Sequence, residues 1–421
     1  MNAPPRKLPI PLVLVLLAGF AVGVLVERAG WMPGRRTPGD PSLRGDYAAL
    51  WEAREKIQAN FVNRDKTNDA NLASGAINGM VNALDDRGHT AYLSKKGRER
   101  MREGLSGEIE GIGARVALVS QRATVVQVMP KSPARTAGVR AGDVLVAIDG
   151  QSTLGQTLQQ VVNRLRGKTG STVQLRLARV GSKNPLEMSV ARQKVDVPEV
   201  SWHMLPGEPR VAHLTFQRFT ATSSKQMHAV LGEIAKKDIA GLVFDMRGNS
   251  GGLKEQAIAI AAEFLVPDTV VLTQEDAAGK REEVRTGGDG LWRDKPMVVL
   301  VDGGSASSAE ILAGALQDHE RARIVGTRTY GTGTVLREFG LKDGSALLLA
   351  VSLWRTPKGR QIWNQGIQPD KDCLVALPAG ALPVIPDDER ALTKEEFART
   401  TDKQLVEALA RLRERMGAKE P

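Results

Sequence analysis

The 421-residue sequence has a single cysteine, Cys373, and only five histidines. One cysteine excludes an intrachain disulfide, and it also excludes metal sites built on several cysteines. The histidines are scattered, with no pair at the spacing of a helical zinc motif, which argues against a zinc enzyme. The sequence therefore predicts no metal and no other cofactor.

The sequence also lacks a long run of charge of one sign. The formal net charge is +10, but the basic residues between Lys95 and Arg102 are interrupted by acids. This mixture is typical of a solvated surface, so no nucleic-acid partner is expected. The chain is 42% hydrophobic, with 43 glycines and 21 prolines, as in a globular protein with many tight turns, and it is long enough for two or three domains.

One apolar run stands near the N-terminus. Arg6 and Lys7 precede about 19 residues, 8–26, that are apolar apart from proline and glycine, which is near the minimum length for a membrane-spanning helix. The basic flank predicts a cytoplasmic N-terminus. A cleaved signal peptide is the alternative, although no convincing cleavage site follows. We predict an anchor over 1–29, a linker over 30–46, and a single-pass cell-membrane protein whose bulk is periplasmic or outside.

Periodicity divides the rest of the chain into four parts. Residues 47–104 have the spacing of amphipathic helices, and residues 105–195 alternate like short strands. Residues 196–372 repeat a strand, glycine turn and helix, which is typical of a largely parallel or mixed sheet. Residues 373–421 form a charged helical tail with a leucine stripe, better suited to packing or dimer contacts than to a site. The predicted fold is therefore multidomain, α/β and α+β.

Two glycine-rich turns follow consecutive buried-strand patterns and lead into helices, at 245–252 and 302–307. A helix N-terminus presents unpaired N–H groups, which can hold a phosphate or the oxyanion of an acyl transfer. Neither turn matches the Walker or dinucleotide-binding spacing. Simple helix capping is the alternative for either turn. Together the two turns indicate a nucleophile, Ser307, beside oxyanion donors.

Several segments, in order along residues 47–372, resemble the carboxyl-terminal processing, or tail-specific, serine peptidases. The segment 84–93 is similar to their Asp-His-Thr segment, and 245–253 to their oxyanion loop. The segment 304–318 is similar to the region of their nucleophile. The remaining similar segments are those of their PDZ domain and of the end of their catalytic core: 111–114, 132–138, 141–145, 356–360 and 366–370.

The resemblance implies a role for each matching residue. The nucleophile lies three residues before the glutamate of its motif, Glu310, and is therefore Ser307. The N–H groups of Gly251 or Gly252 and of Ser308 would hold the oxyanion. The resemblance also implies that the PDZ domain binds the free C-termini of protein or peptide substrates through the loop Gly111, Ile112, Gly113 and Ala114. A homo-oligomer is possible.

The sequence departs from this family at the catalytic base. The family has a Gly-Lys-Gly-Thr-Val-Gln motif, but here Thr332 stands at the lysine position, 25 residues after Ser307, and Leu336 at the glutamine position. A threonine hydroxyl is not a base near neutral pH. Three hypotheses follow: an endopeptidase that uses another base, a non-catalytic protein that binds C-terminal tails, or a different use of the same cleft. One candidate replacement base is Lys254, which can also be a solvated first-turn residue. His89 is better explained as structural, and Lys358 as exposed. A Ser-Thr hydroxyl relay through Thr332 to water is a weak further candidate.

Overall fold

The structure of the protein is a computed structural model that divides into two compact units, residues 1–83 and 84–421. The predicted anchor, 1–29, lies outside the described residues. Within the part of the chain that the structure describes, no helix is long and apolar enough to cross a membrane. The described residues are 41–86, 89–119, 121–129, 131–196, 198–378, 381, 383–389 and 392–417.

The described part of the first unit, residues 41–83, contains two α-helices joined by a short 3-10 turn. These elements are α2 (Pro41–Asn60), η1 (Arg64–Lys66) and α3 (Asp69–Asn82). The side chain of Asn68 caps α3 by accepting from the Asn71 N–H. Arg54 and Gln58 of α2 donate to the Asp69 carboxylate at 2.6 and 2.7 Å, which fixes the start of α3 against α2.

The second unit contains a β-rich module over residues 108–196. Its six-stranded sheet has the order β3-β4-β5-β7-β8, with β6 paired to β5, and a separate ribbon pairs β2 with β9. Inward residues of β7, Val173, Leu175 and Leu177, are fully buried, as the period-two alternation predicts. The elements of the module are β2 (Glu108–Gly111), β3 (Ala114–Val119), β4 (Arg122–Val128), α5 (Pro133–Thr136), β5 (Val144–Ile148), β6 (Gln151–Ser152), α6 (Leu158–Leu165), β7 (Thr172–Ala178), β8 (Leu186–Ala191) and β9 (Gln193–Asp196).

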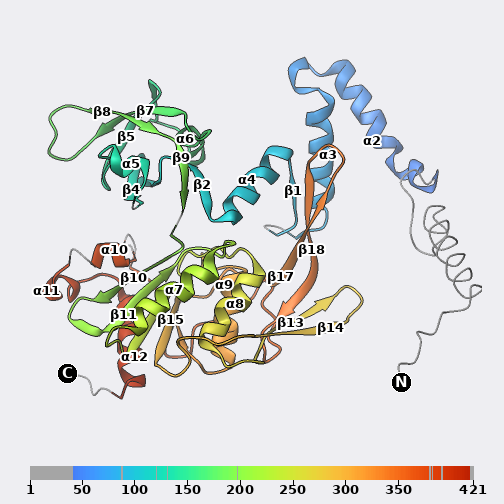
Figure 1. The fold of residues 1–421 in the computed structure, drawn as a ribbon. Coiled ribbons are helices and arrows are strands. Elements are labelled where there is room, and N and C mark those ends of the chain that lie inside the picture. Colours follow the sequence, from blue (N-terminus) through green and yellow to red (C-terminus); the bar gives the residue numbers. More distant parts are fainter. Residues whose placement is uncertain are drawn as a thin grey trace, which may run out of the picture. The chain divides into compact units, whose positions relative to one another are not determined.

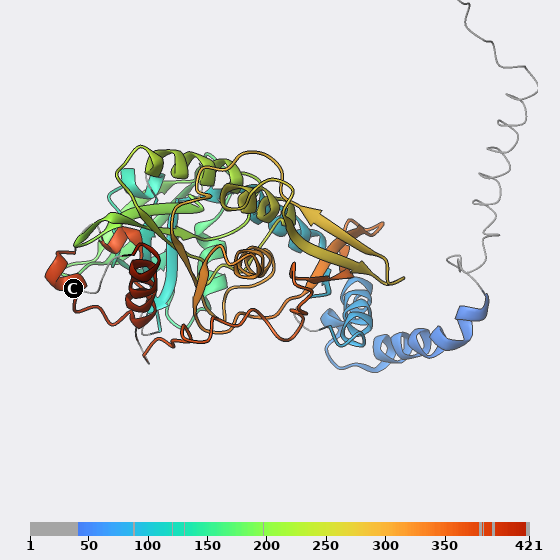
Figure 2. The same cartoon turned by 90° about the horizontal axis from the view of Figure 1, so that it is seen from below.

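The α/β core is built on a mixed sheet of order β10-β11-β12-β15-β16, in which only the β10–β11 pair is antiparallel. Alternate residues of its strands face two separate apolar cores. Helices α7, α8 and α9 pack on one face, and α12 packs on the other (Figures 1 and 2). The elements are β10 (Val200–Leu205), β11 (Glu208–Phe216), α7 (Ser223–Ala235), β12 (Gly241–Asp245), α8 (Lys254–Phe264), β15 (Met297–Val301), α9 (Ser308–Asp318), β16 (Arg323–Gly326) and α12 (Lys403–Arg415).

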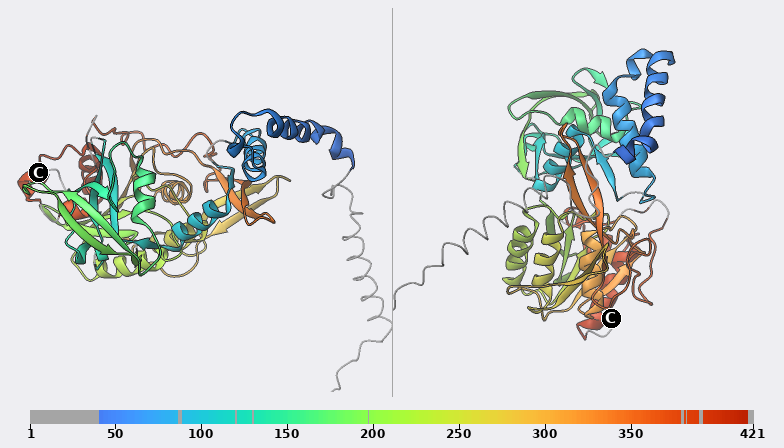
Figure 3. Two further views of the ribbon diagram at one scale, coloured as in Figure 1. Left: turned by 90° about the horizontal axis from the view of Figure 1, so that it is seen from above. Right: turned by 90° about the vertical axis from the view of Figure 1, so that its right-hand side faces the viewer.

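A second sheet of the same unit has the order β1-β18-β13-β14, with β17 paired to β18 in a long hairpin (orange in Figure 3). β1 lies in the region predicted to be helical, 47–104, because its pairing with β18 outweighs the local preference. Helix α4 follows β1 and leads into the β-rich module. The elements are β1 (Ala91–Leu93), α4 (Lys95–Ser106), β13 (Val270–Asp276), β14 (Arg281–Arg285), β17 (Thr334–Gly340) and β18 (Ala346–Arg355).

The C-terminal tail packs on the core. Leu405, Leu409 and Leu412 of α12 are buried against Val243 and Leu300 of the central sheet. The predicted leucine stripe is therefore a packing surface within this chain. Two short helices, α10 (Pro386–Glu389) and α11 (Lys394–Phe397), precede α12.

Candidate active site

The two glycine turns lie side by side where β12 and β15 end. The Ala306 N–H donates to the Asn249 carbonyl at 2.9 Å, and the Ser308 hydroxyl donates to the Gly252 carbonyl at 2.9 Å. A side chain at Gly251 would lie 2.7 Å from Cβ of Ser307, so only glycine allows this approach. The predicted nucleophile and the predicted oxyanion turn are therefore in direct contact.

Ser307 occupies a strained backbone conformation. Its φ and ψ are 55° and −118°, at the residue that precedes α9. Non-glycine residues rarely adopt this region, and such strain is concentrated at functional sites where the surroundings enforce it. The Ser307 N–H donates to the Glu310 carboxylate at 2.8 Å, which holds the turn in place.

Glu310 connects the nucleophile turn to the segment 329–332. Its buried carboxylate accepts four hydrogen bonds: from the N–H groups of Ser307, Gly331 and Thr332, at 2.7–2.9 Å, and from the Thr329 hydroxyl at 2.5 Å. A buried carboxylate is tolerated when its oxygens are satisfied in this way. We call Gly251, Gly252, Ser307, Ser308 and Glu310 the nucleophile cradle.

The two glycines of the oxyanion turn have different roles. The Gly251 N–H already donates to the Asn249 side-chain oxygen at 2.9 Å. Gly252 has φ +142°, and an added Cβ would lie 2.1 Å from the Phe219 carbonyl oxygen. Among the described residues, the N–H groups of Gly252 and Ser308 have no acceptor. These two donors are therefore available to an oxyanion, whereas that of Gly251 fixes the turn.

Thr332 lies beside Ser307, as its alignment with the family lysine predicts. Its buried hydroxyl accepts from the Ser307 N–H at 3.2 Å. The side chain therefore contacts the backbone of the nucleophile. Leu336, on β17, faces the same groove as both residues. Within the described residues, the Ser307 hydroxyl makes no hydrogen bond to a lysine or histidine.

The three candidate bases lie in different surroundings. Lys254, the first residue of α8, is half-buried and lines the groove with Ser307; its Nζ donates to the Gln274 side-chain oxygen at 3.2 Å. His89 is buried against Asp86 and Thr334, 3.3 Å from each, and its position is structural. Lys358 is exposed and pairs with a surface glutamate. Of the three, the groove contains Lys254.

The groove has a volume of about 720 Å³. One wall comes from the two glycine turns and α8, and the other from β17 and β18. Its lining is largely apolar, with the Met101, Ile311, Leu348 and Val351 side chains, so an extended peptide could occupy it with apolar side chains.

A buried ionic network adjoins the oxyanion turn through Arg247. The sequence did not predict this network. Arg247 pairs with Asp245 at 2.6 Å and with Asp402, the N-cap of α12, at 2.9 Å. Burial lowers the pKa of the adjacent His213, but hydrogen bonds to Asp245 and Glu389 outweigh this effect and raise the pKa to about 9. Burial raises the pKa of Asp245, but Arg247 and His213 outweigh it and hold that pKa well below its ordinary value.

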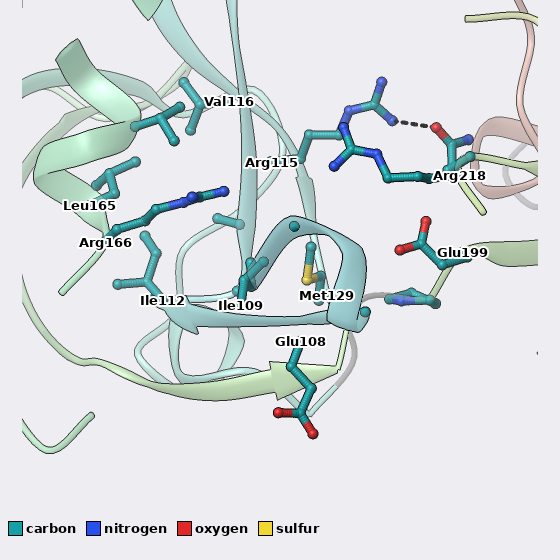
Figure 4. A pocket seen from close by; sticks show the side chains of 18 of the residues that line it. Glu108, Ile109, Ile112, Arg115, Val116, Met129, Leu165, Arg166, Glu199 and Arg218 are labelled. Carbon is teal, nitrogen blue, oxygen red and sulfur yellow. Dashed lines mark hydrogen bonds between the residues drawn. The ribbon is translucent and has the colours of Figure 1, made fainter. Parts of the chain in front are cut away.

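The second predicted site lies in the β-rich module. The loop Gly111, Ile112, Gly113 and Ala114 lines a pocket of about 370 Å³ together with Leu165 of α6. Figure 4 shows Ile112, Val116 and Leu165 gathered on one side of this pocket, and Arg115, Arg218 and Glu199 on the other. Gly113 has φ +72°, and a Cβ there would lie 2.3 Å from Ser132. The predicted carboxylate-binding loop therefore borders a cavity with both apolar and cationic walls.

Known proteins share both modules. The sequence model of peptidase family S41 matches residues 210–373, and that of the PDZ domain matches residues 124–179. A carboxy-terminal-processing protease of Bartonella bacilliformis is 36% identical over 324 residues, which is 75% of this chain and 72% of that protein.

Two further relatives are informative. The carboxy-terminal processing protease CtpA of Bacillus subtilis is 33% identical, over 77% of this chain and 68% of that protein. The solved structure of a candidate S41 protease from Bacteroides fragilis is 18% identical with a TM-score of 0.54, covering 80% of this chain and 88% of that one, and it supports the fold alone. The chain therefore belongs to peptidase family S41, as a serine-type peptidase of the carboxy-terminal processing kind with a PDZ domain.

Proposed function

We propose that this protein is an exported, membrane-anchored serine endopeptidase that cleaves proteins near their C-termini. The observation that carries this proposal is the nucleophile cradle: a strained Ser307 at the start of α9, fixed by Glu310 and packed against the oxyanion turn. Such a geometry aims a hydroxyl at a carbonyl carbon while backbone donors face the developing negative charge.

Each part of the site has a role in this proposal. Ser307 attacks the scissile carbonyl, and the N–H groups of Gly252 and Ser308 hold the oxyanion. The loop 111–114 binds the terminal carboxylate of the substrate, and the apolar side of the same pocket receives its last side chain. Thr332 fixes the Ser307 backbone at the place of the family lysine.

The location of the protein is also a proposal. The basic flank and apolar run of 8–26 support a single-pass anchor with the bulk of the chain outside the cytoplasm. Apolar side chains exposed on α2, among them Trp51 at 63%, support a homo-oligomer. Membrane fractionation with protease protection, and light scattering in detergent, test these two proposals.

The alternative is a protein that binds C-terminal tails without cleaving them. The observation that favours it is the pair Thr332 and Leu336, which replaces the lysine and glutamine of the family. In this alternative the PDZ domain performs the function, and the groove at most holds the peptide.

A fluorophosphonate probe distinguishes the two functions. The full chain in detergent is compared with Ser307→Ala and with a double variant, Thr332→Lys with Leu336→Gln. The peptidase proposal expects wild-type labelling and peptide cleavage that Ser307→Ala abolishes. Activity that appears only in the double variant would support the non-catalytic alternative, because it would show an intact cradle without a base.

A further inference from the structure

We propose that Lys254 is the general base for Ser307 and that Gln274 holds it in place. This inference rests on the proposed peptidase function and supplies the group that the replacement of the family lysine leaves open. A serine hydroxyl is a weak nucleophile unless an adjacent base takes its proton, and a neutral lysine amine can do so.

The position of Lys254 follows from the oxyanion turn. It comes two residues after Gly252 and begins α8, so its backbone adjoins the turn that packs against Ser307. Its side chain enters the same groove of about 720 Å³. The side chain is half-buried, unlike that of Lys358, which is 59% exposed. Lys254 is therefore placed on the same wall of the groove as the nucleophile.

Gln274 gives the lysine a fixed partner. The Lys254 Nζ donates to Gln274 Oε1 at 3.2 Å, across from α8 to β13, and both residues line the groove. The amide oxygen accepts one hydrogen of the amine and so holds it at a fixed place in the groove. The groove therefore contains a lysine and glutamine pair, but α8 and β13 supply it instead of positions 332 and 336.

The other titratable residues that line the groove are weaker candidates. Arg337 carries a guanidinium, which offers only hydrogen-bond donors, and Tyr330 is 55% exposed. Glu255 is exposed and follows Lys254 by about 100° around the helix, so the two side chains point to different sides. Among the described residues that line the groove, Lys254 is the only amine.

The reaction balances without a co-reactant other than water. The Ser307 hydroxyl proton moves to the Lys254 amine as the oxygen bonds to the scissile carbonyl carbon. The carbonyl electron pair moves to its oxygen, beside the Gly252 and Ser308 N–H groups. When the C–N bond breaks, the Lys254 ammonium returns the proton to the leaving amine, and water then releases the acyl group from Ser307 by the same route.

The first test compares Lys254→Met with the matched control Lys358→Met in the full chain. The readouts are the rate of Ser307 labelling by a fluorophosphonate and the cleavage of a peptide with a free apolar C-terminus. We expect Lys254→Met to lose at least about 100-fold in both, and the control to stay near wild type. Labelling of Lys254→Met at the wild-type rate overturns the assignment of the base.

Two further variants separate a base from a structural residue. Adding Thr332→Lys and Leu336→Gln to Lys254→Met should restore activity.

Lys254→Cys treated with bromoethylamine should also regain activity. The basic limb of its pH–rate profile should move to lower pH, because a thioether makes the amine less basic. Wild type treated in the same way controls for modification of Cys373. An unmoved pH profile overturns the proposal. If wild type shows no Ser307-dependent labelling, the peptidase function itself fails, whereas equal labelling of wild type and Lys254→Met overturns only the role of Lys254.

Discussion

The two sides of Ser307 differ in how closely they keep the family pattern. On the backbone side, the nucleophile cradle has the glycines, the serine and the glutamate of the family motifs, and in the fold this serine is strained and this glutamate is buried. On the side of the base, Thr332 and Leu336 replace the lysine and glutamine, while Lys254 and Gln274 meet in the same groove. The cradle is fixed by backbone geometry that tolerates few side chains. A base needs only an amine in reach, so it can come from another element.

The largest effect is expected where the cradle depends on glycine. In Gly252→Ala, the new Cβ would lie 2.1 Å from the Phe219 carbonyl oxygen, which forces the turn apart. We expect a loss of about 5 kcal/mol in the free energy of unfolding and no labelling of Ser307. Gly248→Ala is the matched control, because a Cβ at Gly248 would meet open space. Only the positive φ of this residue opposes the substitution, so we expect a loss of about 1 kcal/mol in the free energy of unfolding. Denaturant unfolding measures both, and equal losses would contradict the role of the close approach.

The next effect concerns the support beneath the oxyanion turn. Asp402→Asn removes a charge that pairs with buried Arg247, so we expect a loss of about 3 kcal/mol. The matched control on the same helix is Glu407→Gln, which breaks the pair with Arg411 and should change stability by less than about 0.5 kcal/mol. Comparable losses in the two variants would show that the network does not support the turn.

Glu310→Gln tests the cradle with almost no change of shape. The amide keeps one acceptor oxygen but turns its NH₂ toward donors that the carboxylate had satisfied. We expect a loss of about 2 kcal/mol and slower labelling of Ser307. Thermal unfolding and labelling rates measure the two effects. Wild-type labelling in Glu310→Gln would mean that the cradle does not need the fourfold acceptor.

A further effect is a dependence on pH. The folded chain keeps a proton on His213, whose pKa is about 9, whereas the unfolded chain releases it near the ordinary value of 6.5. The stability from His213 is therefore complete below pH 6.5 and is lost as the pH rises to about 9. Thermal unfolding between pH 6 and 10 should show this decline, and His213→Gln should flatten it. The same slope in that variant would assign the decline to another group.

Most of the fold could be predicted because its strands and helices have strong periodicity. The two glycine turns predicted after buried strands follow β12 and β15, and the second leads into α9 as predicted. The local sequence pattern also identified the two turns, since glycine and serine directly before a helical pattern indicate a turn that caps the helix. The roles assigned to Ser307, Thr332 and the PDZ loop remain predictions.

The contacts that could not be predicted join residues far apart in the sequence. Nothing local indicates that Asp402 meets Arg247, 155 residues earlier, or that Gln274 on β13 meets Lys254. Likewise, the sequence could not separate Gly251 from Gly252, because the difference depends on which N–H the Asn249 side chain accepts. Each of these contacts follows from tertiary packing of elements that were predicted one by one.

The contact between Arg247 and Asp402 also bears on the order in which the enzyme matures. A chain synthesised only as far as residue 373 already contains Ser307 and both glycine turns. Yet Arg247 would then pair with Asp245 alone and would lack its cover, because its second carboxylate and the leucines of α12 have not been made. We expect the oxyanion turn to become ordered only once α12 docks, so the growing polypeptide stays inert toward its neighbours during synthesis.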